Sequence, residues 1–193
     1  MIYIVRHGQT DLNSRQLLQG RSDYPLNENG VRQAQEAAVR LRGVAFSRVF
    51  TSPLVRAVQT AQILAPGVIP DVDEKLIEMD YGPYEGTDLT HLPPEVITFF
   101  SDFVHNRAPE GMEPLEAVVC RAGEFMEKHC RTGENILIST HAIAMKGILE
   151  YLTPESKGAW WSKYIGNCAV YITEYRQGQF SVPEELGLDE VSG

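Results

Sequence analysis

MIYIVRHGQTDLN, residues 1–13, is the most informative stretch of the sequence. Residues 2–5 are apolar and rich in β-branched side chains, which is typical of a buried strand. The run ends abruptly at Arg6-His7-Gly8, so a basic pair lies at the carboxyl end of the strand. Ligands of open α/β sheets bind outside the carboxyl ends of their strands. The stretch therefore predicts a site for an anionic substrate at the end of the first strand.

The rest of the chain alternates between short apolar runs and amphipathic helical patterns. This alternation predicts an α/β protein, a three-layer α/β/α sandwich with a mostly parallel central sheet. An insertion from about 82 to 114 is expected to cover the strand ends. Further strands are predicted at 48–51, 68–72 and 135–139, helices at 27–41, 53–64, 93–103, 116–130 and 142–152, a loop at 12–24, and an edge hairpin formed by 169–175 and 180–182.

The length and composition of the chain fit one domain with a sizeable core. The chain has 193 residues, of which 43% are hydrophobic and 22% are charged. We expect one catalytic domain over residues 1–183 and an acidic, mobile tail over residues 184–193. No linker or internal repeat divides the sequence.

The charge and the cysteines limit the partners and the compartment. The net charge of −9 and the pI of about 5.0 argue against nucleic acid and anionic membranes as partners. Cys120, Cys130 and Cys168 lack the spacing of a metal site and are odd in number, which indicates free thiols. No apolar run has the length of a membrane span or a signal peptide, so we expect a soluble cytoplasmic protein.

Four junctions after predicted strands each carry a polar group. They are Arg6 with His7, then Arg56, Glu78 and His141. Two permanent cations, two imidazoles and one carboxylate match the needs of phosphoryl transfer, which are a nucleophile, charge stabilisation and a proton donor. We expect these groups to converge, because the carboxyl ends of parallel strands share one edge of the sheet.

At this point the sequence resembles the histidine phosphatases, the phosphoglycerate mutase-like superfamily. The resemblance spans most of the chain and favours the phosphatase branch. RHG alone is a weak signal, whereas several motifs in the family's order are specific. The motifs are RHGQTDLN at 6–13, LNENGVRQA at 26–34, TSPLVRAVQTA at 51–61, EMDYGPYEG at 78–86 and STH at 139–141.

The resemblance implies a role for each residue of the core set. His7 is expected to be the nucleophile that becomes phosphohistidine, and Glu78 the proton donor. Arg6, Arg56 and His141 are expected to bind the phosphoryl oxygens. Further substrate contacts are expected from Asn13, Gln19, Gly20 and Ala142, with Thr10 supporting the loop.

The chemistry of these roles sets conditions on the two central groups. His7 must be neutral to attack, and the neighbouring cations are expected to hold its pKa below about 6.5. Glu78 must carry a proton to release an alkoxide, and it then activates the water that cleaves phosphohistidine. Asp80 and Glu85 compete with Glu78 for this role.

Two positions depart from the family pattern. Ala142 stands where many members have glycine after the second histidine, although alanine keeps the backbone N–H. Residues 111–113, Gly-Met-Glu, stand where many relatives carry a Gly-Glu-Ser-like sequence. This second departure concerns the contacts on the substrate side.

These observations predict a phosphomonoesterase that hydrolyses a small phosphorylated metabolite through phosphohistidine, without a metal or another cofactor. One alternative is phosphoglycerate mutase-type transfer, and another is a non-catalytic phospho-ligand binding protein. A zinc hydrolase would use His7, Glu78 and His141 as ligands, but the adjacent arginines would repel the metal. The candidate substrates, such as α-ribazole phosphate or sugar phosphates, and the oligomeric state stay open.

Overall fold

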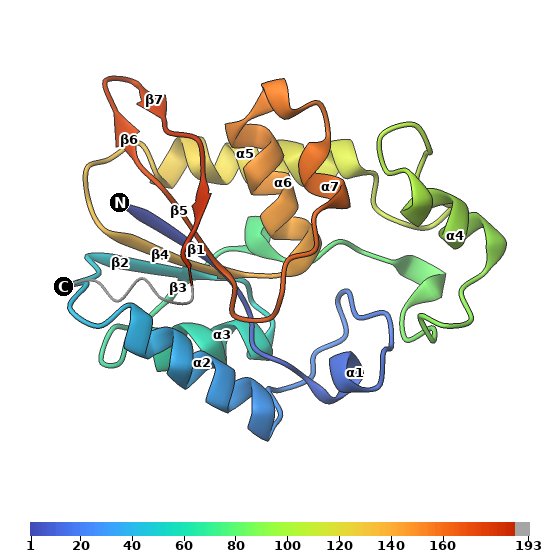
Figure 1. Cartoon of the computed structure of the whole chain (residues 1–193), viewed down its shortest axis with the longest axis horizontal. Helices are drawn as coiled ribbons and strands as arrows, with labels where there is room; N and C mark the ends of the chain where they lie inside the picture. Colours follow the sequence, from blue (N-terminus) through green and yellow to red (C-terminus); the bar gives the residue numbers. More distant parts are fainter. Residues whose placement is uncertain (188–193) are drawn as a thin grey trace.

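A central sheet of six strands organises the computed structural model, which describes residues 1–187 (Figure 1). The strand order is β3-β2-β4-β1-β5-β8. The first four strands in this order are parallel, whereas β5 runs antiparallel to β1 and β8 antiparallel to β5. The bounds are β1 Ile2–Arg6, β2 Arg48–Thr51, β3 Asp71–Val72, β4 Ile136–Thr140, β5 Val170–Thr173 and β8 Glu184–Glu185.

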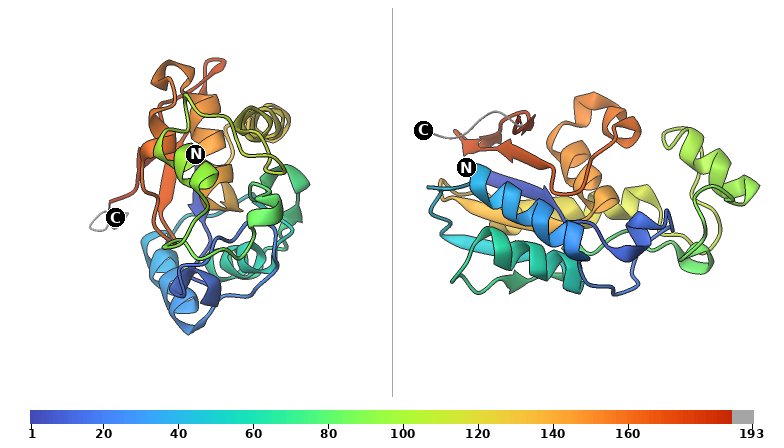
Figure 2. Two further views of the ribbon diagram at one scale, coloured as in Figure 1. Left: turned by 90° about the vertical axis from the view of Figure 1, so that its right-hand side faces the viewer. Right: turned by 60° about the horizontal axis from the view of Figure 1, so that its bottom comes forward.

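Helices cover both faces of the sheet, which confirms the predicted three-layer architecture (Figure 2). On one face lie α2 (Glu28–Arg40) and α3 (Val55–Leu64). On the other lie α5 (Leu115–His129) and α6 (Ala142–Leu152).

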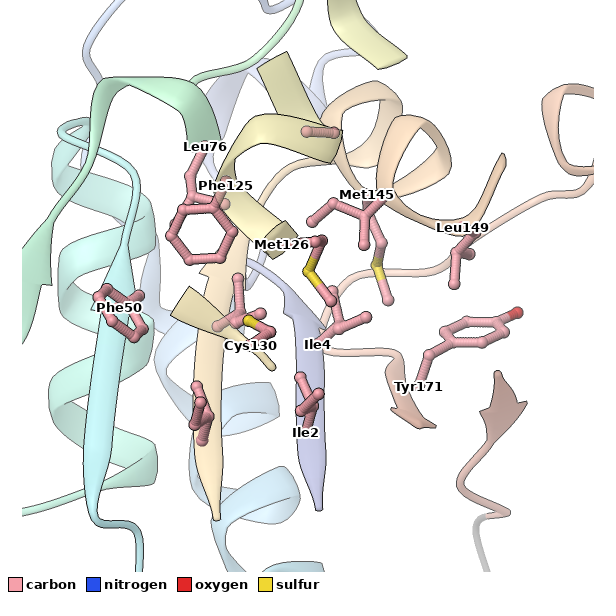
Figure 3. Close-up of a cluster of buried hydrophobic side chains, with 14 of the residues drawn as sticks. Ile2, Ile4, Phe50, Leu76, Phe125, Met126, Cys130, Met145, Leu149 and Tyr171 are labelled. Atoms are coloured by element: carbon pink, nitrogen blue, oxygen red, sulfur yellow. The ribbon is translucent and has the colours of Figure 1, made fainter. Parts of the chain in front are cut away.

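The alternation of side chains along β1 builds both halves of the core. Ile2 and Ile4 pack toward α5 and α6, and Figure 3 shows Ile4 close to Met126. Tyr3 and Val5 point to the opposite face, toward α2 and α3. Because β1 is buried on both faces, it reads as a continuous apolar run in the sequence.

The predicted cover lies beyond the carboxyl ends of the parallel strands, on the right of Figure 1. It contains α4 (Pro94–Ser101) and the 3₁₀ helix η2 (Gly82–Tyr84), and it is preceded by the 3₁₀ helix η1 (Glu74–Leu76). Its aromatic side chains form a third apolar cluster with Trp161. Trp161 belongs to the short helix α7 (Ala159–Ser162), which follows the 3₁₀ helix η3 (Pro154–Ser156).

The structure corrects several boundaries. The loop predicted at 12–24 overlaps a short helix, α1 (Asp11–Ser14), which a capping box between Thr10 and Asn13 stabilises. The expected tail begins with β8, which extends the sheet through backbone bonds to β5, so that prediction was wrong for residues 184–185. Its last six positions, 188–193, lie outside the described residues.

The predicted hairpin is also divided differently. Its first strand, β5, belongs to the central sheet, while β6 (Tyr175–Arg176) and β7 (Gln179–Phe180) form a separate small sheet. The turn falls at Gln177-Gly178, between the two predicted strands, and both residues have positive φ. None of the helices within residues 1–187 is long and apolar enough to cross a membrane.

Candidate active site

The carboxyl ends of β1 and β4 bring the two motif histidines together. Arg6 pairs with Thr140 in the parallel register, and the next residue, His7, donates its backbone N–H to the Thr140 carbonyl at 2.9 Å. The rings of His7 and His141 therefore lie side by side, with centroids 5.1 Å apart. Both side chains are buried.

Arg56 joins the two histidines from the first turn of α3. Its Nε donates to His7 Nε2 at 3.3 Å and to His141 Nδ1 at 3.2 Å. Its terminal nitrogens donate to the carbonyls of Ser22 at 2.7 Å and Gly20 at 2.6 Å. The guanidinium is thus fixed by the loop after α1, and its side chain is fully buried.

These contacts assign the protons of both imidazoles. A nitrogen that accepts from a guanidinium N–H carries a lone pair, so His7 Nε2 and His141 Nδ1 are unprotonated. The opposite nitrogens donate, from His7 Nδ1 to the Gly8 carbonyl at 2.6 Å and from His141 Nε2 to Ser52 Oγ at 2.7 Å. His7 is therefore neutral, with the lone pair of Nε2 facing the site.

Electrostatics favour the same state. Burial, followed by the charges of Arg56 and Arg6, holds the pKa of His7 well below its ordinary value, as expected from the sequence. Burial and Arg56 act on the pKa of His141 in the same direction. Burial lowers the pKa of Arg56 to about 10, and the Glu78 carboxylate opposes this shift, so the guanidinium stays charged.

Glu78 lies at the N-terminus of α6, where three backbone N–H groups bind its carboxyl group. Oε1 accepts from Met79 and Ala144, both at 2.9 Å, and Oε2 accepts from Ile143 at 3.1 Å. The side chain is 3% exposed. The unpaired N–H groups of a helix N-terminus position such a carboxyl group firmly. Oε2, which accepts a single bond, keeps a lone pair for a proton.

The two competing carboxylates occupy structural positions. Glu85 accepts hydrogen bonds from the backbone N–H groups of Gly20 at 2.8 Å and of Arg21 and Ser22 at 3.3 Å. Asp80 forms an ion pair with Arg21 at 3.1 Å and is partly exposed. Glu85 therefore shapes the loop that binds Arg56, and neither group is held against α6 as Glu78 is.

The loop after β1 brings together the predicted phosphate contacts. Gln19 Oε1 accepts from Thr10 Oγ1 at 2.6 Å and from Asn13 Nδ2 at 3.3 Å. Its amide nitrogen is buried and has no partner among residues 1–187, and the same holds for Arg6 Nε. A second Arg6 nitrogen donates to the Ile165 carbonyl at 2.5 Å. Two buried donors without acceptors fit an anionic ligand.

Gly20 takes part in the site through its backbone. The Gly20 carbonyl binds Arg56, and a Cβ at this position would lie 2.6 Å from the Met79 carbonyl oxygen, so only glycine fits. Ala142 is the first residue of α6, directly after His141, and its side chain is half-buried.

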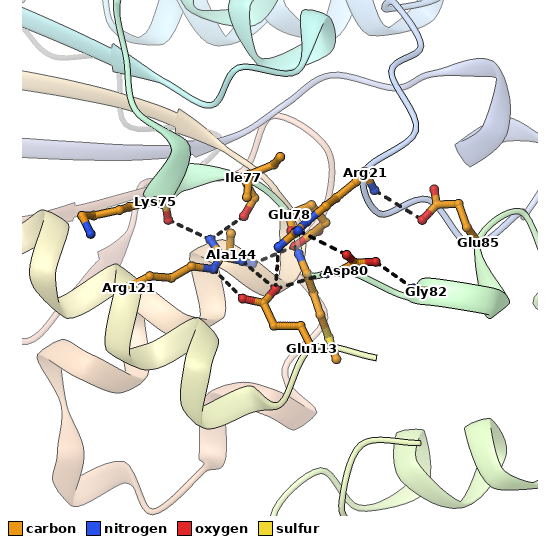
Figure 4. A network of polar contacts seen from close by, with 11 residues as sticks. Arg21, Lys75, Ile77, Glu78, Asp80, Gly82, Glu85, Glu113, Arg121 and Ala144 are labelled. Carbon is orange, nitrogen blue, oxygen red and sulfur yellow. Dashed lines mark hydrogen bonds and ion pairs between the residues drawn. The ribbon is translucent and has the colours of Figure 1, made fainter. Parts of the chain in front are cut away.

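A network of charged side chains lies next to Glu78 (Figure 4). Glu113 accepts from Arg121 at 2.8 Å and from Arg21 at 3.3 Å, and Arg21 also contacts Asp80. Glu113 belongs to the segment that departs from the family pattern. It therefore ties the cover to α5 and to the loop of Arg21, and its charge is balanced within this network.

Several supporting residues were not predicted. Ser52 fixes the His141 ring, Thr60 accepts from the Gly8 N–H at 3.1 Å, and Asn167 donates to the His7 carbonyl at 3.0 Å. Ser52 and Thr60 lie inside a quoted motif, so their positions gave a signal. Nothing in the sequence around Asn167 indicated its role.

A zinc site would need a set of metal ligands, and the part of the chain that the structure describes contains none. Residues 1–187 hold no group of three or more histidine, cysteine, aspartate or glutamate side chains arranged for a metal ion. The hydrogen bonds of His7, His141 and Glu78 to cationic or N–H donors also differ from metal ligation, in which lone pairs face the metal.

Comparisons with known proteins agree with this geometry. The profile of the histidine phosphatase superfamily (branch 1) matches residues 2–184. "Probable phosphoglycerate mutase GpmB" of Cronobacter sakazakii is 30% identical, over 91% of this chain and 85% of the relative. A Bacillus stearothermophilus structure, YhfR, is 30% identical with a TM-score of 0.80, covering 94% of each chain.

A further structure shares the fold at lower identity. Phosphoserine phosphatase of Entamoeba histolytica, in complex with 3-phosphoglyceric acid, has a TM-score of 0.84 and 23% identity, and the match covers 98% of each chain. The profile match and the 30% identity over most of the sequence establish kinship beyond shape. The chain belongs to branch 1 of the histidine phosphatase superfamily.

Proposed function

We propose that the protein is a metal-independent phosphomonoesterase that hydrolyses a small phosphorylated metabolite through a phosphohistidine on His7. The observation that carries this proposal is the shared hydrogen bonding of Arg56 to His7 Nε2 and His141 Nδ1 inside a buried site. This observation supports the proposal because phosphoryl transfer requires a neutral nucleophile beside a fixed cation.

In the first step, His7 Nε2 attacks phosphorus and the bond between phosphorus and the ester oxygen breaks. Arg6 and Arg56 stabilise the charge on the phosphoryl oxygens. His141 joins them when Nδ1, which otherwise accepts from Arg56, takes up a proton and donates to a phosphoryl oxygen. Gln19 Nε2, a buried donor, adds to this group, with Asn13 and Thr10 holding its side chain. Glu78 gives its proton to the leaving alkoxide.

In the second step, water attacks the phosphorus of phosphohistidine and Glu78 takes the proton from the water. The bond between phosphorus and Nε2 breaks, which restores neutral His7 and releases inorganic phosphate. The hydrogen bond from His7 Nδ1 to the Gly8 carbonyl holds the ring in one orientation through both steps.

The name of the 30% identical relative favours a second candidate, phosphoglycerate mutase activity. Here the phosphohistidine would return its phosphate to a bound acceptor before water reacts. The two reactions share the first step and differ in the fate of the phosphoenzyme. A third possibility, binding without turnover, would require that the assembled groups perform no chemistry.

One set of measurements tests these candidates. We expect rapid quenching with a labelled phosphomonoester to trap an acid-labile phosphoenzyme, and His7→Ala to abolish both this species and turnover while retaining weak phosphate binding. His91→Ala, at an exposed histidine, serves as the control. Turnover of His7→Ala at the wild-type rate would refute the nucleophile.

The mutase candidate needs its own assay. With 3-phosphoglycerate and 2,3-bisphosphoglycerate, we expect release of inorganic phosphate. Efficient isomerisation without phosphate release would replace the phosphatase proposal with the mutase. Binding of phosphate esters without any turnover would instead indicate a non-catalytic protein.

A further inference from the structure

Lys146 is a buried cation that the proposed mechanism does not use. It lies in the second turn of α6, and its side chain is 9% exposed. Helical side chains lean toward the N-terminus of their helix, so Lys146 leans toward the end that carries His141 and binds Glu78.

The immediate surroundings of the ammonium hold it at the border of the site and the cover. Its Nζ donates to the Trp161 carbonyl at 2.7 Å and lies 5.8 Å from the centre of the Phe103 ring. No carboxylate among residues 1–187 forms an ion pair with it. A buried charge without an ionic partner is costly, and a bound anion would offset that cost.

Two charged groups of the candidate site, Glu78 and Arg6, act on Lys146. Burial lowers its pKa to about 8, the Glu78 carboxylate opposes this shift, and Arg6 adds to it. At neutral pH the ammonium is therefore mostly protonated. Lys146 lies two residues after Ala144, whose N–H binds Glu78. Lys146 and Arg6 also donate to carbonyls of one segment, those of Trp161 and Ile165. These contacts place Lys146 beside the groups of the proposed reaction.

The other cations near the site have anionic partners once a phosphate monoester is bound, whereas Lys146 has none. Arg6 and Arg56 match the charge of about −2 on the phosphoryl group. Glu78 is neutral when it holds the proton for the leaving group. Arg21 and Arg121 are matched by Asp80 and Glu113. Glu85 and Asp23 also act on Arg56. Lys146, in contrast, forms no ion pair with a carboxylate of residues 1–187.

Resting on the proposed function, we propose that Lys146 is a specificity-determining residue that binds a carboxylate on the organic part of the substrate. The preferred substrates are then phosphomonoesters of carboxylic acids. The Phe103 ring lies 5.8 Å from the ammonium, and the side chain is 9% exposed, so little water screens its attraction for an anion.

Two matched substrate pairs test this assignment. One pair is 3-phosphoglycerate and glycerol 1-phosphate, and the other is phosphoserine and phosphoethanolamine; in each pair only the first member carries a carboxylate. We expect wild-type kcat/KM to favour the first member by about 10- to 100-fold, the range that corresponds to a charged hydrogen bond.

Lys146→Met should reduce this ratio to near one and change kcat/KM for glycerol 1-phosphate, whose organic part is uncharged, by less than about threefold. Lys146→Arg should retain part of the preference, because it keeps the charge. Lys163→Met is the control, since Lys163 lies just after α7 but pairs with Glu185 at 3.1 Å. Thermal melting of each variant verifies folding.

Other outcomes overturn the assignment in distinguishable ways. Equal wild-type rates within both pairs would refute it without any variant. If Lys146→Met lowers kcat/KM equally for both members of a pair, Lys146 only anchors α7 through the Trp161 carbonyl. Failure of the wild type to hydrolyse any of the four esters, or p-nitrophenyl phosphate, would refute the proposed function instead.

Discussion

The neutral state of the two buried histidines predicts a specific acid weakness of the fold. In the unfolded chain each histidine takes up a proton as the pH falls through about 6.5. In the folded protein His7 and His141 stay neutral well below that value, because they are buried beside Arg56. The unfolded state then binds more protons, so the free energy of unfolding falls with falling pH.

The size and the window of this effect follow from linkage. Because the pKa of each histidine is lower in the folded state, the free energy of unfolding is unaffected above pH 6.5. It decreases as the pH falls from 6.5 to the folded-state pKa. The loss approaches about 1.4 kcal/mol per pH unit for each histidine, so at pH 5.5 the pair accounts for about 3 kcal/mol. Domains of this kind have roughly 5–15 kcal/mol in total.

Urea unfolding at pH 7.5 and pH 5.5 measures the effect, in buffers free of phosphate because a bound anion would stabilise the fold. We expect His141→Gln to remove about half of the histidine contribution to the difference between the two pH values. His91→Gln, at an exposed position, should leave the difference unchanged. An identical loss in wild type and His141→Gln would refute the assignment of a neutral buried imidazole.

Three further predictions address the groups around the nucleophile. Arg56→Lys should lower the free energy of unfolding by about 2–4 kcal/mol and kcat/KM by at least about 100-fold, because lysine cannot bind both carbonyls and both rings; urea unfolding and phosphate release measure the two effects. Glu78→Gln should reduce kcat strongly for alkyl phosphates and far less for p-nitrophenyl phosphate, because its phenolate leaves without a proton. Equal losses of kcat for the two substrates would contradict the acid role. The control, Asp80→Asn, should leave the ratio of the two rates unchanged. Dialysis against a chelator should leave kcat unchanged, and elemental analysis measures the metal content before and after dialysis. A loss of activity that added zinc restores would contradict a metal-independent reaction.

The elements that could be predicted from the sequence are those whose residue pattern follows directly from their burial. β1 and β4 are apolar because both of their faces are buried, and each is followed by a polar group at the sheet edge that carries the candidate site. His7 and His141 could be expected together for that reason. Arg56 and Glu78 required the order of the family motifs, since a single arginine or glutamate carries little information.

Other features depend on contacts that leave no pattern in the sequence. β8 is an exposed pair of glutamates held by backbone bonds to β5, so its side chains predict a tail. Glu85 has the composition of a catalytic acid, and only its bonds to residues 20–22 distinguish a structural role. Lys146 lies within an apolar helix pattern, where its burial depends on α7 and the cover.

The geometry of Arg56 explains why the loop after β1 matters as much as the strand. A guanidinium has five N–H donors. In Arg56 one is shared between the two imidazoles and two are bound by Ser22 and Gly20, which leaves one hydrogen on each terminal nitrogen for a phosphoryl oxygen. The side chain is therefore ordered by folding rather than by the ligand, so binding loses little rotamer entropy. Gly20 makes this possible because no other residue fits against Met79 at that position, and the same loop holds Gln19 with its donor turned inward.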